Sequence, residues 1–196
     1  SGHCALEYED TAAALAEVHR VLKPGGDAQF VLHHADSALI ESARASVREA
    51  DLVFTQTKVF RQLHKLVSMT EVTAQTDAAT TALRASIKEL KEALERARQA
   101  GAGDLLDKAL DAIQKLLAAR NDMSARAVGL EVDRAEAQLR GSTRQLKTMV
   151  KYSRSAADMD ALEQQAARAG FSLIERTPYW HAGKLLAGWQ LMLHRA

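Results

Sequence analysis

Residues 15–37 have the sequence LAEVHRVLKPGGDAQFVLHHADS, which has the pattern of a helix, a turn, a buried strand and an exit loop. Leu15, Val18 and Leu22 recur with helical spacing, so they lie on one face of the expected helix. Pro24 disfavours helical geometry at the residue before it, and the two glycines after it allow a tight reversal of the chain. Residues 28–32 are a short, mainly apolar run of strand length. A helix that turns directly into such a strand is half of a βαβ unit.

This stretch and the residues before it resemble a known family of enzymes. Residues 5–8 (ALEY), 15–17 (LAE) and 20–26 (RVLKPGG) are similar to the segment after the fourth strand of class I S-adenosylmethionine-dependent methyltransferases. In that family the RVLKPGG helix end leads into the fifth strand, which corresponds here to residues 28–33.

The C-terminal end of the sequence resembles the same family. Residues 169–177 and 188–195 are similar to the end of the family's last helix and to its closing antiparallel hairpin. The resemblance covers residues 4–37 and 156–196. It implies that the chain contains an α/β remnant, which is the C-terminal part of a Rossmann-like methyltransferase sheet. In that sheet the last strand inserts between strands five and six. The rest of the chain is expected to be mostly helical.

The family binds its cofactor mainly through the first half of the sheet, with a glycine-rich loop after strand one. Such a loop lets backbone N–H groups and a helix N-terminus approach the ligand closely. The nearest glycine pairs here are a helix stop at residues 25–26 and an interhelical break at residues 101–103. We therefore expect a C-terminal fragment, whose full-length parent binds S-adenosylmethionine and which binds no cofactor by itself.

The composition of the chain limits which partners and which cellular compartment we expect. The formal net charge is +1, which gives no global attraction to nucleic acid or to a membrane surface, so nucleic acid is not an expected partner. The single cysteine, Cys4, fits a reducing compartment, and we expect a cytoplasmic protein. No apolar run reaches the length of a membrane span.

Residues 38–155 depart from the family pattern and are expected to be a helical insertion. Leucines and other apolar residues follow a 4-3 spacing, the pattern of a coiled-coil seam, over residues 83–97 and again over residues 106–117. Residues 38–71 are predicted to form one long helix or two consecutive helices. Residues 70–81 are predicted to be a loop or a frayed helix end. Residues 123–150 are predicted to form a long helix with Met123 and Leu130 on its apolar side. The bundle either caps the substrate or pairs with another subunit as an interaction module without activity of its own.

Two pairs of residues follow predicted strands at the edge where α/β sheets bind ligands. His33 and His34 follow strand five, and either could act as a catalytic base, because a histidine near its ordinary pKa suits proton transfer. Glu7 and Tyr8 follow strand four and, by the resemblance, would face a small-molecule or lipid-like methyl acceptor. The alternative is that both histidines only satisfy hydrogen bonds at the strand exit.

Adjacent strand residues point to opposite faces, so the two histidines cannot share a metal, and we predict no metal site.

Other side chains allow two interpretations. Tyr179 and Trp180 either stack on substrate or pack the hairpin against helices together with Trp189. A row of cations at 4-3-4-3 spacing is either an anion-binding surface or a solvated face partly paired with Glu89, Glu92 and Glu95, and the solvated face is favoured. The row consists of Arg140, Arg144, Lys147, Lys151 and Arg154.

The sequence also predicts self-association. With strand four missing, residues 28–33 would present an unpaired strand edge, which is a template for pairing with another chain. We expect a homo-oligomer, such as a dimer, through this edge or through the helices.

Overall fold

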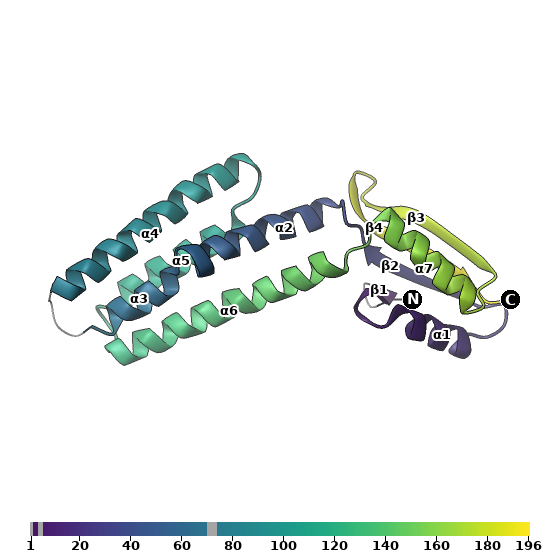
Figure 1. Cartoon of the computed structure of the whole chain (residues 1–196), viewed down its shortest axis with the longest axis horizontal. Helices are drawn as coiled ribbons and strands as arrows, with labels where there is room; N and C mark the ends of the chain where they lie inside the picture. Colours follow the sequence, from purple (N-terminus) through teal and green to yellow (C-terminus); the bar gives the residue numbers. More distant parts are fainter. Residues whose placement is uncertain (1, 4–5, 70–73) are drawn as a thin grey trace. The chain divides into compact units, whose positions relative to one another are not determined.

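The computed structural model describes residues 2–3, 6–69 and 74–196 and is mostly helical, with one four-stranded sheet (Figure 1). The chain divides into two compact units. The sheet unit comprises residues 1–43 and 148–196, and the helical unit comprises residues 44–147. From the sequence we placed the helical insertion at residues 38–155.

The sheet has the strand order β1-β2-β4-β3. The strand bounds are β1 Gly2–His3, β2 Asp27–His33, β3 Leu173–His181 and β4 Leu185–His194. β4 is antiparallel to both β2 and β3 and lies between them, as predicted for the closing hairpin. β3 continues through Pro178 to His181, so the turn of the hairpin is confined to residues 182–184.

The prediction of a fully unpaired edge on β2 is wrong. β1 pairs in parallel with β2, and the paired positions are Gly2 with Phe30 and His3 with Val31. A second strand thus blocks part of the edge that was expected to template association.

Two helices pack on one face of this sheet. They are α1 Thr11–Val21 and α7 Ala156–Arg168. Asp10 caps α1 as predicted, because its carboxylate accepts the backbone N–H groups of residues 12 and 13. Ser155 and Asp158 form a reciprocal capping box at the start of α7. The helices bury Leu15 and Met159 in one cluster with Leu32 and Leu191 of the sheet.

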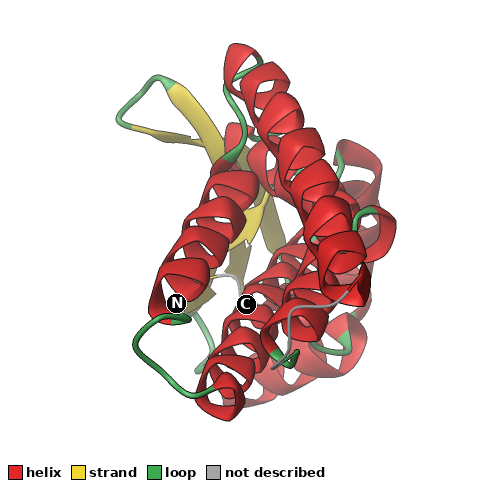
Figure 2. Cartoon of the chain, turned by 90° about the vertical axis from the view of Figure 1, so that its left-hand side faces the viewer, coloured by secondary structure: helices red, strands yellow, loops and turns green. Residues whose placement is uncertain are grey.

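The helical unit consists of helices joined by short loops (Figure 2). The bounds of its elements are α2 Ala38–Asp51, the π-helix η2 Leu52–Gln56, α3 Val59–Val67, α4 Ala74–Gln99, α5 Asp104–Ala119 and α6 Ala125–Tyr152, of which α2 and α6 extend beyond the unit. α4 packs against both α3 and α5. The seam residues Leu83, Leu90, Leu106 and Ile113 are buried in a single core within this unit.

Two local predictions for this unit are corrected. Residues 74–81 belong to α4 rather than to a loop, whereas residues 70–73 lie outside the described part of the chain. Met123 and Leu130 are exposed, and α6 instead buries Val128 and Val132. Leu139, a third residue of the expected apolar side, does pack against the core, so the predicted face of α6 is wrong only near its start.

Candidate active site

The carboxyl end of β2 carries a buried carboxylate–histidine pair. The short 3-10 helix η1 Leu6–Tyr8 places Glu7 beside the last residue of the strand. One carboxylate oxygen of Glu7 accepts the backbone N–H of His33 at 2.9 Å, and the other contacts Nδ1 of the His33 ring. Glu7 is only 1% exposed. The two contacts hold the imidazole in one orientation relative to the strand end.

His34 lies in a different environment. Its ring stacks on Trp189 of β4, with the ring centroids 4.3 Å apart. Its Nδ1 accepts the backbone N–H of Asp36 at 3.0 Å. Burial lowers the pKa of His34, and the nearby charge of Asp36 opposes this shift to a smaller extent.

The hydrogen bonds assign opposite tautomers to the two histidines. A carboxylate can only accept, so the Glu7 contact places the His33 proton on Nδ1 and leaves the lone pair on Nε2. A backbone N–H can only donate, so the neutral His34 ring carries its proton on Nε2. Of the two predicted bases, His33 is thus the one that a carboxylate partner orients.

Arg154 joins this site through its backbone, a role that the sequence did not indicate. The Arg154 backbone N–H donates to the His33 carbonyl at 2.8 Å. The Arg154 carbonyl accepts two hydrogen bonds, from the backbone N–H of Ala35 at 2.9 Å and from the indole Nε1–H of Trp189 at 2.9 Å. The Arg154 guanidinium donates to the hydroxyl of Thr11 at 3.3 Å. The strand exit is therefore fixed on both sides, by Glu7 and by Arg154.

The predicted cationic row is not one continuous helix face. α6 ends at Tyr152, and Arg154 bridges β2 as just described. Arg140 pairs with Glu136 of its own helix at 2.6 Å. Two of the three expected glutamate partners form ion pairs within α4, where Glu92 faces Lys88 and Glu95 faces Arg98.

The other predicted binding residues are exposed. Tyr8 is 40% exposed, and its ring meets the ring of Tyr152 edge-on at 5.5 Å. Tyr179 and Trp180 are 38% and 51% exposed, so the prediction that they pack the hairpin against helices is wrong. Only Trp189 of the three aromatic residues is buried.

The register of the sheet nevertheless places Tyr179 in the same row as His33. Both residues are opposite Gly188, so their side chains emerge on one face of the sheet, about 10 Å apart across two strand spacings. A Cβ atom at Gly188 would collide with the backbone carbonyl of Leu32, so glycine is required where β4 approaches β2 at this position.

Within the described residues, no group of three or more histidine, cysteine or acidic side chains is placed to bind a metal ion. The Glu7–His33 pair supplies an oriented base at a strand end.

Comparison with known proteins assigns no family. No family model matches the chain, and no curated protein or solved structure was found to match it. No described helix is long and apolar enough to cross a membrane.

Proposed function

We propose that the sheet unit is the closing part of a class I S-adenosylmethionine-dependent methyltransferase and that the protein transfers a methyl group to a small-molecule or lipid-like acceptor. The observation that carries this proposal is the strand order. A parallel pair, β1-β2, is followed by an antiparallel strand, β4, inserted between β2 and β3. The resemblance predicts this order of β2, β4 and β3 as strands five, seven and six, and β1, which was not expected, lies where the family has strand four. The RVLKPGG segment leads into β2, the strand that this interpretation assigns as strand five.

In this proposal His33 is the base and Glu7 its positioning residue. Methyl transfer from a sulfonium is an in-line displacement, and the acceptor loses a proton when its nucleophilic atom is a hydroxyl or amine. The methyl–sulfur bond breaks as the bond to the acceptor forms, and Nε2 of His33 takes the acceptor's proton. The uncharged products are then S-adenosylhomocysteine and the methylated acceptor, with the proton on the imidazolium stabilised by Glu7.

The cofactor would be held by a glycine-rich half-sheet supplied by a further polypeptide segment. The helical unit then serves as the acceptor's cap. The alternative, a pairing module, is less favoured because the seam residues Leu83, Leu90 and Ile113 are already buried within the unit. Pairing through them would require the bundle to open.

Calorimetric titration with S-adenosylhomocysteine tests this proposal. We expect no binding heat with the 196-residue chain and micromolar binding with a longer polypeptide in which a cofactor-binding half-sheet of the family is fused before it. In that polypeptide, His33→Asn should retain cofactor binding and lose methyl transfer, whereas His181→Asn, at an exposed position of the hairpin, should retain both. Clear binding to the 196-residue chain, or none to the longer polypeptide, would overturn the assignment.

A further inference from the structure

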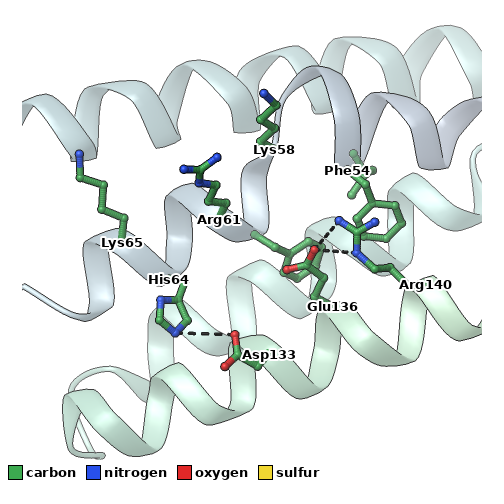
Figure 3. A pocket seen from close by; sticks show the side chains of 10 residues that line it. Phe54, Lys58, Arg61, His64, Lys65, Asp133, Glu136 and Arg140 are labelled. Atoms are coloured by element: carbon green, nitrogen blue, oxygen red, sulfur yellow. Dashed lines mark hydrogen bonds and ion pairs between the residues drawn. The ribbon is translucent and has the colours of Figure 1, made fainter.

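The helical unit contains an open groove of about 870 Å³ that the proposed chemistry does not use (Figure 3). It lies between the η2–α3 segment and α6. Its volume is within the range of small-molecule sites. The groove is lined by Val53, Phe54, Lys58, Phe60, Arg61, His64, Lys65, Asp133, Glu136 and Arg140.

One wall of the groove is cationic. Lys58 precedes α3, and Arg61 and Lys65 follow on it at helical spacing, so the three side chains share one edge of the groove. All three are exposed, and none has an ion-pair partner among the residues that the structure describes.

The two acidic residues of the opposite wall have basic neighbours within the groove. Glu136 pairs with Arg140 at 2.6 Å, and Asp133 faces Nε2 of His64 at 3.6 Å. Four permanent cations and two carboxylates line the groove, so an excess of two positive charges remains. The chain as a whole carries a formal charge of only +1, and the excess is therefore a local feature.

The inner surface of the groove is aromatic. The rings of Phe54 and Phe60 stack with centroids 6.1 Å apart, and Phe60 is buried. The guanidinium of Arg140 lies 4.2 Å from the centre of the Phe54 ring. A ligand can thus place an apolar body on the half-buried ring of Phe54 while its charged group reaches the α3 edge.

The turn that presents Lys58 is held by buried polar contacts. The hydroxyl of Thr57 donates to the carbonyls of Leu52 and Val53 at 2.9 and 3.1 Å, which closes the π-helix. The side-chain amide of Gln62 donates to the Thr57 carbonyl at 2.7 Å. π-helical turns are often found at functional sites. The backbone that presents Lys58 is therefore held in place by contacts within the protein.

We propose that this groove binds a phosphate-bearing amphiphile, with the phosphate at Lys58, Arg61 and Lys65 and the apolar body on Phe54, whose ring packs on the buried Phe60. A planar guanidinium matches two phosphate oxygens at once, and the flanking lysines add charge. The ligand is either a soluble aromatic phosphate or the headgroup end of an anionic lipid. This inference rests on the groove alone and stands whether or not the sheet unit transfers methyl groups.

The first experiment uses 1-naphthyl phosphate as the probe, with binding measured by calorimetry and located by amide NMR shifts. We expect shifts in residues 53–65 and 133–140 and an affinity that falls as salt is raised. The neutral analogue 1-naphthol and inorganic phosphate should each bind at least tenfold more weakly. 1-Naphthol lacks the phosphate group that the cations bind, and inorganic phosphate lacks the aromatic ring.

Charge variants provide the decisive comparison. Arg61→Gln combined with Lys65→Gln should weaken 1-naphthyl phosphate binding at least tenfold. The matched control is Arg84→Gln with Lys91→Gln, two exposed cations of α4 outside the groove, and it should leave the affinity unchanged. All four side chains are exposed, so these variants should fold. Equal binding of phosphate and naphthol, or equal effects of the two double variants, would overturn the proposal.

Vesicles distinguish the two sources of the ligand. If phosphatidic acid–phosphatidylcholine vesicles bind the chain and displace 1-naphthyl phosphate, the ligand is a lipid headgroup. If vesicles fail to displace it while the soluble probe still binds through Arg61 and Lys65, the ligand is a soluble phosphate.

Discussion

The carboxylate of Glu49 accepts the backbone N–H of Gly103 at 2.8 Å, although Gly103 lies 54 residues further along the chain. The same carboxylate accepts the N–H of Leu105 at 3.1 Å. Glu49 is buried on α2 and caps the N-terminus of α5, where unpaired N–H groups and the helix dipole favour a negative charge. This one side chain joins two helices that the sequence does not obviously pair.

Glu49→Ala should destabilise the helical unit by about 2–3 kcal/mol, because it leaves buried N–H groups without acceptors. Glu49→Gln keeps one acceptor oxygen but loses the charge, so it should cost less. Urea unfolding followed by circular dichroism measures both. Glu89→Ala, an exposed position on α4, is the control and should change the free energy of unfolding by less than about 0.5 kcal/mol. Equal effects at positions 49 and 89 would show that the cap contributes nothing.

Opposite tautomers at His33 and His34 are a second prediction. The Glu7 contact requires the proton on Nδ1 of His33, and the Asp36 N–H requires it on Nε2 of His34. Nitrogen-15 NMR of the imidazole rings at pH 8 distinguishes these forms directly. Glu7→Gln should leave the His34 tautomer unchanged and remove the strong preference at His33. Identical tautomers at the two positions in the unmodified protein would contradict the geometry.

The stability of the sheet unit should fall as the pH is lowered from 7.5 to 5.5. Burial depresses the pKa of His34 in the folded state below its value of about 6.5 in the unfolded chain. The unfolded state therefore binds more protons in this range, and protonation pulls the equilibrium toward it as the pH drops. Above the unfolded pKa the ring is neutral in both states and has no effect.

His34→Asn tests this pH dependence. Asparagine can accept the Asp36 N–H in place of Nδ1 but does not titrate. The fall in unfolding free energy between pH 7.5 and 5.5, measured by urea unfolding with tryptophan fluorescence, should be smaller in the variant. A variant with the same pH dependence as the parent would assign the effect to other groups.

Parts of the fold could be predicted because local chemistry determines them. The helix ending before Pro24, the strand after Gly26 and the closing hairpin depend on turn residues and apolar runs that lie close together in sequence. The capping role of Asp10 is equally local. Such features need no knowledge of distant contacts.

The features that were missed depend on tertiary partners. Met123 and Leu130 fit an apolar helix face by spacing, yet packing selects Val128 and Val132 instead. The Glu7–His33 pair joins residues 26 positions apart, and the sequence indicated each residue separately without their contact. The π-helix before Lys58 cannot be recognised from the spacing of the apolar residues, because it changes the helical periodicity by only a single residue.

Lys58 provides the last prediction, since it is a non-glycine residue in the left-handed region, with φ of 51°. This conformation costs an L-residue with a side chain roughly 1–2 kcal/mol, whereas glycine adopts it freely. Lys58→Gly should therefore stabilise the helical unit by about 0.5–1 kcal/mol, once the greater freedom of glycine in the unfolded chain is subtracted. Lys58→Gln is the matched variant, because it removes the charge and keeps the strain. Both variants should bind 1-naphthyl phosphate more weakly, but only the glycine variant should raise the free energy of unfolding. Weaker binding in both variants, with higher stability only in the glycine variant, would mean that the protein keeps a strained turn because the turn places the Lys58 cation at the groove. Unchanged affinity in both variants would show that Lys58 is not part of the phosphate site.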